Sequence, residues 1–348
     1  MSAFPVRHLA IVGATGAVGR ECCAILDQRG FHADRVTLLA SQRSAGAVIN
    51  VGGADRTVEV LQPADFEGVD IAIFSAGAET SRRFAPIAVQ AGAIVIDNSS
   101  AFRMDPTVPL VIPEINPGDL DGQRGIIAVP NCSAIIMLMA IAPIHGRFPI
   151  KRIVVSTYQS ASGAGARAMH ELIEQTRQHL NGESIRPVVF PHPIVFNLFC
   201  HNTVIGPDGY NGEERKMIDE TRKILHAPDL SISPTCVRVP VLRAHSESIN
   251  LEFDRAVAPD AVRELLCRAP GVRVVDDRVN NRFPMPIDAT GRDDVLVGRI
   301  RQDASRPDGR GIDLFVSGDQ LRKGAALNAV QIAEHIATGI RPRVSVAQ

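Results

Sequence analysis

The stretch Leu9-Ala10-Ile11-Val12-Gly13-Ala14-Thr15-Gly16-Ala17-Val18-Gly19 decides the fold of the amino-terminal half. Its first four residues are typical of a buried strand, and a helical pattern runs on from about Ala17 to Gln28. Glycines spaced G-x-x-G-x-x-G between a strand and a helix permit a tight turn and a close approach of phosphate to the helix N-terminus. The stretch therefore predicts a dinucleotide-binding loop, although a glycine-rich turn that serves only chain geometry would share its pattern.

Strand-like runs and helical patterns alternate through the rest of this half. The runs cover 36–40, 71–75, 94–97 and 126–129, with a helical pattern near 80–91. Because strands that alternate with helices build βαβ units, we expect a parallel sheet. The segment Phe74-Ser75-Ala76-Gly77 covers the end of the run 71–75 and the two residues after it.

The alternation of predicted strands and helices ends after residue 132. A long helical pattern, a strand at 152–158, a polar helix near 164–180 and β-rich segments at 235–241 and 248–253 predict a second, α+β domain. The last helical pattern, 324–336, is amphipathic and is expected to return to the first sheet. We therefore expect one domain from 1–131 with 323–348 and another from 132–322.

Composition excludes several classes of protein. The 348 residues are 45% hydrophobic, which supports two folded cores, and 37 basic against 38 acidic side chains give a net charge of −1. No global charge favours nucleic acid or an anionic membrane, and no apolar run or secretion signal directs the chain to a bilayer. We expect a cytoplasmic protein.

The cysteine spacing does not predict a metal site. No pair among the six cysteines has C-x-x-C spacing. Cys22 and Cys23 fall inside an apolar helical pattern, where cysteine most often acts as a small buried hydrophobe.

The segment after the second predicted strand bears on the choice of nucleotide. It reads Ser41-Gln42-Arg43-Ser44, with no carboxylate where an NAD site usually places one for the ribose hydroxyls. Hydroxyl and guanidinium groups suit a 2′-phosphate, so the segment favours NADP over NAD. The alternative is a polar loop with a solvated arginine.

A second chemical signal lies in Ala128-Val129-Pro130-Asn131-Cys132-Ser133-Ala134-Ile135. A cysteine at the point where a strand and a tight turn enter a helix faces unpaired N–H groups and the positive helix end, which favour the thiolate. The segment from Cys236 to Ser246 supplies a cation, Arg238, and an imidazole, His245, which we expect at the end of the strand predicted at 235–241. A buried structural thiol is the alternative for Cys132.

Seven ordered motifs between about residues 8 and 340 resemble those of the aspartate-semialdehyde dehydrogenase family, in its bacterial form. They are the loop Gly13–Gly19, Asp97-Asn98-Ser99-Ser100-Ala101-Phe102-Arg103, Pro130-Asn131-Cys132-Ser133, Gln159-Ser160-Ala161-Ser162-Gly163-Ala164-Gly165, Gly212-Glu213-Glu214-Arg215-Lys216-Met217, the segment from Arg238 to His245, and Asp319-Gln320-Leu321-Arg322-Lys323-Gly324-Ala325-Ala326.

The resemblance implies a fold and a reaction. The fold is a Rossmann-type dinucleotide-binding domain plus an α+β catalytic and dimerisation domain of the glyceraldehyde-3-phosphate-dehydrogenase-like kind. The reaction is the NADPH-dependent reduction of β-aspartyl phosphate to aspartate β-semialdehyde and phosphate, in the biosynthesis of lysine, threonine, methionine and diaminopimelate. It also implies a homodimer.

The resemblance assigns roles to individual residues. Cys132 would be the nucleophile that forms a thioester, and His245 the general acid/base. The substrate would be held by Arg103 and Lys216 at its phosphate, Arg238 at its α-carboxylate, Glu213 at its α-ammonium group, and Gln159 and Asn131 near the thiol. The cofactor contacts expected from the loop and the resemblance are Gly13, Thr15, Gly16, Ala17, Val18, Ser41, Arg43, Ser44, Gly77, Ser162, Gly163 and Asn328.

Four alternatives stay open at this point. N-acetyl-glutamyl-phosphate reductase and glyceraldehyde-3-phosphate dehydrogenase also join a nucleotide loop to a cysteine, but an acylated nitrogen would not need the Glu213 carboxylate. A silent relative that keeps only the fold is disfavoured because Cys132 and His245 are both present. Glu213 and Lys216, three residues apart, could also form an ordinary salt bridge on a helix surface.

Overall fold

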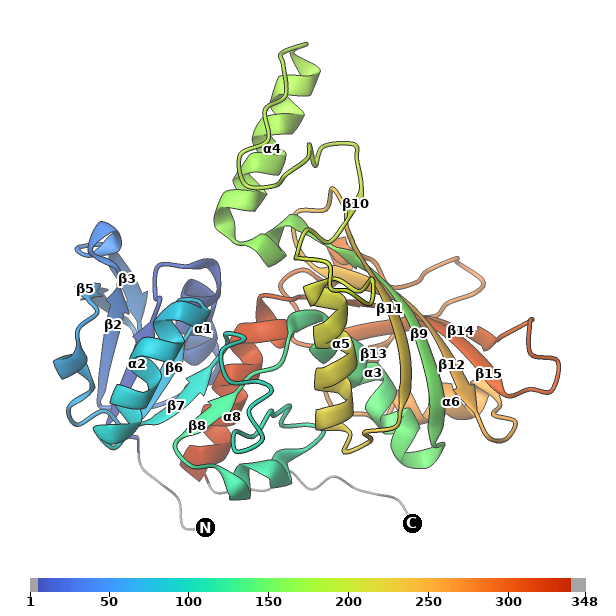
Figure 1. Ribbon diagram of the computed structural model, residues 1–348, viewed down its shortest axis with the longest axis horizontal. Coiled ribbons are helices and arrows are strands. Elements are labelled where there is room, and N and C mark those ends of the chain that lie inside the picture. The colour runs from blue at the N-terminus through green and yellow to red at the C-terminus, as the bar shows by residue number, and fades with distance from the viewer. Residues whose placement is uncertain (1–5, 339–348) are drawn as a thin grey trace. The chain divides into compact units, whose positions relative to one another are not determined.

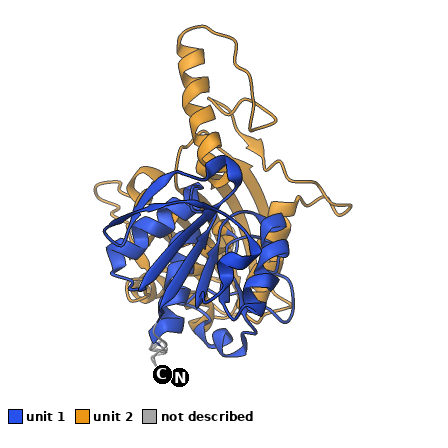
Figure 2. Cartoon of the chain, turned by 90° about the vertical axis from the view of Figure 1, so that its left-hand side faces the viewer, with its two compact units in different colours: residues 1–131, 325–348 blue, residues 132–324 orange. Residues whose placement is uncertain are grey.

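A computed structural model describes residues 6–338. The chain divides into two compact units, 1–131 with 325–348 and 132–324, drawn in different colours in Figure 2. The boundary expected at 322/323 therefore lies two residues before the observed one. The ends of the first expected domain, 1–5 and 339–348, lie outside the described residues.

A six-stranded sheet forms the centre of the first unit, in the order β5-β2-β1-β6-β7-β8, and all its neighbouring strands are parallel. The predicted parallel sheet is confirmed. The strands are β1 (His8–Val12), β2 (Arg35–Ala40), β5 (Glu59–Val60), β6 (Ile71–Phe74), β7 (Ile94–Asp97) and β8 (Ile126–Ala128), with a separate hairpin of β3 (Val48–Val51) and β4 (Ala54–Thr57).

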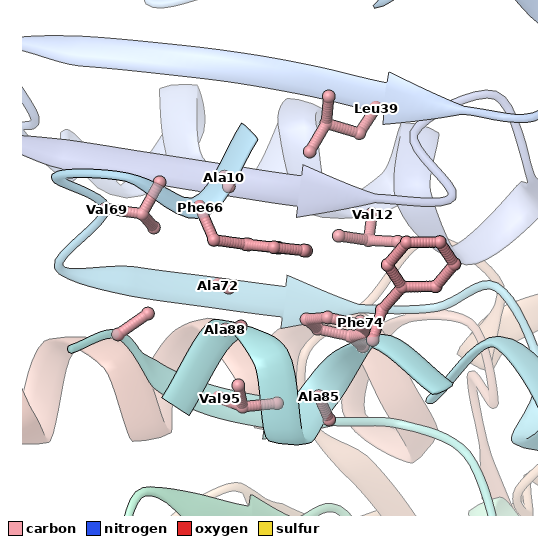
Figure 3. Close-up of a cluster of buried hydrophobic side chains, with 12 residues drawn as sticks. Ala10, Val12, Leu39, Phe66, Val69, Ala72, Phe74, Ala85, Ala88 and Val95 are labelled. Atoms are coloured by element: carbon pink, nitrogen blue, oxygen red, sulfur yellow. The ribbon is translucent and has the colours of Figure 1, made fainter. Parts of the chain in front are cut away.

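Helices bury this sheet. The helices are α1 (Ala17–Arg29), α2 (Ala78–Gln90) and α8 (Leu327–Thr338). Figure 3 shows the core on one face, where Val12 and Phe74 from the strands join Ala85 and Ala88 of α2. Contacts of α8 with α1 and β7 show that the last helix does return to the first sheet, as expected. β1 is buried along its whole length, as is usual for a parallel strand covered on both faces.

The second unit contains a seven-stranded mixed sheet in the order β10-β11-β9-β12-β15-β14-β13. Helices α3, α5 and α6 pack against this sheet, and α4 projects away from it (Figure 1). The strands are β9 (Ile150–Gln159), β10 (Phe199–Cys200), β11 (Ser231–Arg238), β12 (His245–Phe253), β13 (Val272–Val274), β14 (Val295–Gln302) and β15 (Gly311–Gly318). The helices are α3 (Cys132–Arg147), α4 (Ala166–Leu180), α5 (Gly212–Ile224), α6 (Pro259–Leu266) and the short α7 (Pro286–Ala289).

Strand register brings three chain segments to one end of this sheet. β9 and β11 are parallel, with Gln159 opposite Arg238 at their carboxyl ends. β12 is antiparallel to β9, so its first residue, His245, lies at that same end. The sheet thus gathers Gln159, Arg238 and His245 although they are far apart in sequence.

The predicted position of His245 at the end of a strand spanning 235–241 is wrong. β11 ends at Arg238, and His245 begins the next strand. Pro240 has no N–H for a ladder, and Ala244 has a φ of 71°, so the backbone turns between the two strands. The turn carries the imidazole back to the edge where β11 ends.

Two further expectations concern burial and membranes. Cys22 and Cys23 are 0% and 1% exposed, which confirms their expected role as buried hydrophobes, and burial raises the pKa of the Cys23 thiol to about 11. Within residues 6–338, no helix combines the length and the apolar character that crossing a membrane requires.

Candidate active site

The nucleotide loop of the first unit lies between β1 and α1. The Gly13 amide donates to the Leu39 carbonyl at 2.7 Å, so the loop crosses the end of β2. A Cβ on Gly13, whose φ is 86°, would lie 2.8 Å from the Ser75 carbonyl, and one on Gly19 would overlap the Gly13 carbonyl oxygen. These positions therefore require glycine, and the loop sits where the sheet order reverses between β1 and β6.

The first turn of α1 has the form of an anion site. Gly16 is its N-cap and provides no side-chain hydrogen bond, while Thr15, Ala17 and Val18 are half-buried around it. Uncapped N–H groups at a helix start attract phosphate. The loop after β6 enters α2 in the same way, with exposed Gly77 as its N-cap.

The segment expected to recognise the ribose follows β2 as a 3₁₀ turn, Gln42–Ser44. Ser41 and Arg43 are exposed and Ser44 is half-buried. No side-chain hydrogen bond caps this turn. A hydroxyl and a guanidinium thus stand at the carboxyl end of β2 without a carboxylate among them.

Three other predicted site residues of the first unit are buried. Arg103 is 7% exposed, and its guanidinium donates to the Val129 and Asn98 carbonyls, each at 2.9 Å. Asn131, directly before α3, is 6% exposed. The Asn328 amide donates to the Val111 carbonyl at 2.8 Å, which fixes its orientation within this unit.

Cys132 and His245 meet in the second unit. Cys132 is the first residue of α3, as the sequence predicted, and its thiol is half-buried. Its Sγ lies 3.5 Å from Nε2 of His245, which is fully buried at the start of β12. A sulfur at a helix N-terminus beside an imidazole is the environment of a reactive cysteine, so a purely structural thiol fits this geometry poorly.

The surroundings of His245 keep its ring neutral. Burial, with the Arg238 guanidinium as a further cause, lowers the pKa of His245 to about 3. On the other side of the ring, Ser160 contributes both its backbone N–H and its hydroxyl, each 3.0 Å from Nδ1. The sequence motif contained Ser160, but nothing in its spacing marked it as a contact of the histidine.

Arg238 is held from two sides. Its Nη1 donates to the Ser160 carbonyl and its Nη2 to Nε2 of His201, both at 2.8 Å. The guanidinium also lies over the Phe190 ring, 5.6 Å from its centroid. Burial lowers the pKa of His201 to about 4, which keeps Nε2 available as an acceptor.

Sequence reasoning missed His201. It follows the short strand β10, whose Phe199 pairs with Arg238. Two strand residues carry almost no periodicity, so only the observed pairing reveals the contact.

Glu213 and Lys216 share one face of α5. The Lys216 ammonium donates to the Glu213 carboxylate at 2.9 Å, and the Gln159 amide reaches the same carboxylate at 3.3 Å. Gln159 also donates to the Ser133 hydroxyl on α3 at 2.9 Å. Because the Glu213 side chain is only 5% exposed, the pair is not an ordinary surface salt bridge.

Ser162 and Gly163 lie beside the histidine. The Ser162 hydroxyl is 2.8 Å from that of Ser160. A Cβ on Gly163 would lie 2.9 Å from Nη1 of Arg238 and 3.0 Å from Nε2 of His245. The second unit thus gathers Cys132, His245, Gln159, Glu213, Lys216, Arg238, Ser162 and Gly163, while the remaining predicted site residues belong to the first unit.

Comparison with known proteins identifies the family. Residues 8–123 match the family model for the semialdehyde dehydrogenase NAD binding domain, and residues 141–323 match that for the semialdehyde dehydrogenase dimerisation domain. An aspartate-semialdehyde dehydrogenase of Synechocystis is 54% identical over 95% of this chain and 97% of its own. One of Bacillus subtilis is 49% identical over 94% and 97%. The chain belongs to the aspartate-semialdehyde dehydrogenase family.

Solved structures agree with this assignment. The crystal structure of aspartate semialdehyde dehydrogenase II from Vibrio cholerae has a TM-score of 0.92 and 44% identity, covering 95% of this chain and 98% of that one. A second structure of that enzyme, complexed with ASA, has a TM-score of 0.91. The family and the fold class predicted from the sequence are confirmed: an NAD(P)-binding domain is combined with a dimerisation domain in an oxidoreductase.

Proposed function

We propose that this chain catalyses the NADPH-dependent reduction of β-aspartyl phosphate to aspartate semialdehyde and phosphate, in the biosynthesis of lysine, threonine, methionine and diaminopimelate. The observation that carries the proposal is the Cys132 sulfur, 3.5 Å from Nε2 of His245 at the start of α3. Membership of the aspartate-semialdehyde dehydrogenase family supports the same reaction.

Cys132 performs the covalent chemistry. Its thiolate attacks the acyl carbon of the substrate, the bond from carbon to the phosphate oxygen breaks, and phosphate leaves with that electron pair. The product is a thioester on Cys132, next to His245 as its proton-handling partner. A bound reduced nicotinamide supplies the hydride that this thioester needs to become an aldehyde.

Charged side chains of the site match the charges of the substrate. The Arg238 guanidinium, held by Ser160 and His201, presents further N–H groups to an α-carboxylate. The buried Glu213 carboxylate suits a free α-ammonium group, which an N-acetylated substrate lacks. Completing the set, we assign Lys216 and Arg103 to the phosphate and Gln159 and Asn131 to the orientation of the reacting group.

The first unit fits a dinucleotide. The close packing of Gly13 against Ser75 leaves room for a backbone but not for a side chain, and the start of α1 is uncapped. Gly13, Thr15, Gly16, Ala17 and Val18 would hold the pyrophosphate, and Ser41, Arg43 and Ser44 the 2′-phosphate of NADP. The remaining cofactor contacts would come from Gly77, Ser162, Gly163 and Asn328.

Cofactor choice can be tested at Arg43. Since the Arg43 side chain is exposed, Arg43→Ala should leave folding intact. We expect it to lower the preference for NADPH over NADH by about tenfold or more, because it removes a charge-assisted bond to the 2′-phosphate. Ratios of kcat/KM for the two cofactors measure this. An unchanged ratio removes Arg43 from NADP recognition.

The dimerisation domain supports a homodimer as the working form. Size-exclusion chromatography with light scattering should give a mass near twice the 37.4 kDa of one chain. A single-chain mass at assay concentration argues against this part of the proposal.

The reaction itself is tested by phosphate-dependent reduction of NADP. Activity should appear with aspartate semialdehyde, should be lower with N-acetyl-glutamate semialdehyde, and should be lost in Cys132→Ala and after alkylation of Cys132. Cys267→Ala is the matched control, because Cys267 is an exposed thiol outside the site. A preference for the acetylated aldehyde, or full activity without Cys132, contradicts the proposal.

A further inference from the structure

The ring of His201 has a defined orientation beside Arg238. Its Nε2 lies 2.8 Å from Nη2 of Arg238. A guanidinium can only donate, so Nε2 presents its lone pair, and in a neutral imidazole the proton then resides on Nδ1. That nitrogen is 3.3 Å from the Thr203 hydroxyl, to which it can donate. His201 therefore connects Arg238 to Thr203.

Thr203 continues this connection to the start of α5. Its Oγ1 accepts from the Glu213 N–H at 3.0 Å, and its hydroxyl donates to the Asn211 side chain at 3.4 Å. Asn211 is the N-cap of the helix whose first turn carries Glu213. The hydrogen bonds that start at Arg238 thus end at the residue assigned to the α-ammonium group of the substrate. They link it to the residue assigned to the α-carboxylate.

Two buried side chains of α4 hold the segment that precedes His201. We call residues 188–195 the strap. The Glu171 carboxylate accepts from the first two N–H groups of the strap, and the Gln175 amide oxygen accepts from the last two, at 2.8 and 3.3 Å. The Gln175 amide nitrogen also donates to Glu171 at 2.8 Å. Because Glu171 and Gln175 are 7% and 1% exposed, these bonds fix the strap on α4.

The strap places an aromatic ring against Arg238. Phe190 of the strap is buried, and the guanidinium lies over its ring, 5.6 Å from the centroid. Phe199 of β10 meets the same ring edge-on, with the two centroids 5.8 Å apart. The backbone N–H of His201 donates to the Cys236 carbonyl of β11 at 2.8 Å. Arg238 is therefore held at one face by a ring and at one nitrogen by an imidazole.

The Arg238 guanidinium retains donors for a ligand. Ser160 and His201 each accept from one of its terminal nitrogens, and its Nε is buried without a hydrogen-bond partner among residues 6–338. A buried donor without a partner is costly, so its retention points to a ligand that accepts from it. A carboxylate fits, because it can accept two parallel N–H bonds in the guanidinium plane. Binding therefore depends on how that plane is held.

We propose that His201 is a positioning residue, which fixes the plane of the Arg238 guanidinium for the α-carboxylate of the substrate. Glu171 and Gln175 support this position through the strap. The inference rests on the proposed function, because it concerns the substrate of that reaction. It gives α4, which projects from the sheet in Figure 1, a part in substrate binding.

The orientation of His201 can be measured in the protein without ligands. The charged and titratable groups around its ring are Arg238 on β11, Glu213 and Lys216 on α5, and His245 on β12. Burial is the main cause that lowers the pKa of the ring to about 4. ¹⁵N NMR of histidine-labelled protein should therefore show a neutral ring with its proton on Nδ1 at every pH from 8 to 6. The signals that His201→Gln removes assign the residue, and an Nε2–H ring or an imidazolium in that range overturns the inference.

Two substitutions of His201 test its effect on substrate binding. His201→Leu removes the acceptor, whereas His201→Gln can supply an amide oxygen in its place. We expect the leucine variant to raise KM for aspartate semialdehyde by about tenfold, as for the loss of one hydrogen bond to a charged group, with kcat and KM for phosphate nearly unchanged. Glutamine should recover most of this loss.

His192→Leu is the matched control, because it removes an imidazole of the strap that packs on Phe199. It should leave KM for aspartate semialdehyde within about twofold of the wild type. Equal rises in KM for the aldehyde and for phosphate in His201→Leu, or no recovery with glutamine, would indicate a structural role and overturn the inference.

Gln175→Met tests the strap. It keeps the length of the side chain but leaves the last two N–H groups of the strap without their acceptor. We expect KM for aspartate semialdehyde to rise by about three- to tenfold with kcat nearly unchanged. Gln178→Met is the control, since the Gln178 amide donates within α4, to Glu174. A lower urea midpoint for Gln175→Met with an unchanged KM overturns the role of the strap.

Failure of this inference can be told apart from failure of the proposed function. If the wild-type protein does not reduce NADP with aspartate semialdehyde and phosphate, the proposed function fails, while the NMR measurement still decides how His201 is held. If the wild type is active and His201→Leu has an unchanged KM, only the positioning role fails.

Discussion

Gly163 shows how closely the second unit packs around its histidine. The glycine is exposed and has no unusual φ, so nothing in its backbone demands the residue. A larger residue is excluded because the Arg238 guanidinium and the His245 ring lie within 3.0 Å of the position that its Cβ would take. A glycine in a Ser-Gly turn is therefore part of the positioning of two functional groups.

Gly163→Ala should consequently damage catalysis more than stability. The added methyl must displace Arg238 or His245, and a displacement of about 1 Å in an active site costs about a hundredfold in rate. We expect kcat/KM to fall by that order while the urea midpoint changes little. Gly146→Ala in α3 is the control, because its Cβ meets no atom within 4 Å. Wild-type kcat/KM in Gly163→Ala would show that the two side chains do not occupy the described positions.

Individual residues differed in how far the sequence could place them. Cys132 was predictable because helix start, apolar run and residue type all agree at one point. His201 and Ser160 were not, because their contacts with Arg238 and His245 depend on strand pairing and backbone direction. Every residue except proline has a backbone N–H, so the sequence does not show which one contacts a histidine.

Elements of the first unit followed the sequence closely because each parallel strand is a short apolar run followed by a turn. The second unit is harder to predict, since the strands of its mixed sheet combine polar and apolar residues. The segment 231–234 carries a proline and two serines, yet it belongs to β11 beside β9. Long-range pairing overrides the weak local preference there.

Helix α5 places Glu213 through its capping box. The Asn211 side chain accepts from the N–H groups of Glu213 and Glu214, each at 3.0 Å. The Glu214 carboxylate accepts in return from the Asn211 N–H at 2.9 Å and from the Cys236 N–H of β11 at 3.0 Å. The cap therefore ties the helix start to the strand that ends in Arg238.

Asn211→Ala should lower the free energy of unfolding by about 1 kcal/mol, as expected for a lost N-cap. Because the first turn of α5 carries Glu213, KM for aspartate semialdehyde should rise as well. Asn211→Ser restores an acceptor of the right kind and should recover most of both effects. Urea unfolding and initial rates measure them. A stability loss without any change in KM would separate the cap from substrate binding.

At the scale of the whole molecule, buried titratable groups link stability to pH. His201 and His245 have lowered pKa values, so the unfolded chain binds their protons first, and stability falls as pH drops below about 6.5. Glu247 on β12 acts in the opposite sense. It is fully buried, neither carboxyl oxygen has a hydrogen-bond partner among the described residues, and burial raises its pKa well above 4.5.

The sign for Glu247 follows from proton binding. Above pH 4.5 the unfolded chain releases the Glu247 proton while the folded chain retains it, so this residue lowers stability increasingly until the pH reaches its folded pKa. Glu247→Gln removes the titration. We expect the variant to gain stability relative to the wild type by about 1.4 kcal/mol per pH unit, starting near pH 5.

Urea unfolding of both proteins at pH 5, 6 and 7 measures this gain. Comparing the differences between pH values cancels any constant cost of burying the amide in place of the carboxyl group, so only the titration remains. Glu264→Gln replaces an exposed glutamate on α6 and should show no such pH dependence. A stability difference for Glu247→Gln that stays constant across these pH values would mean that the folded protein already holds an ionised, solvated Glu247. In that case the sheet of the second unit must admit water beside β12.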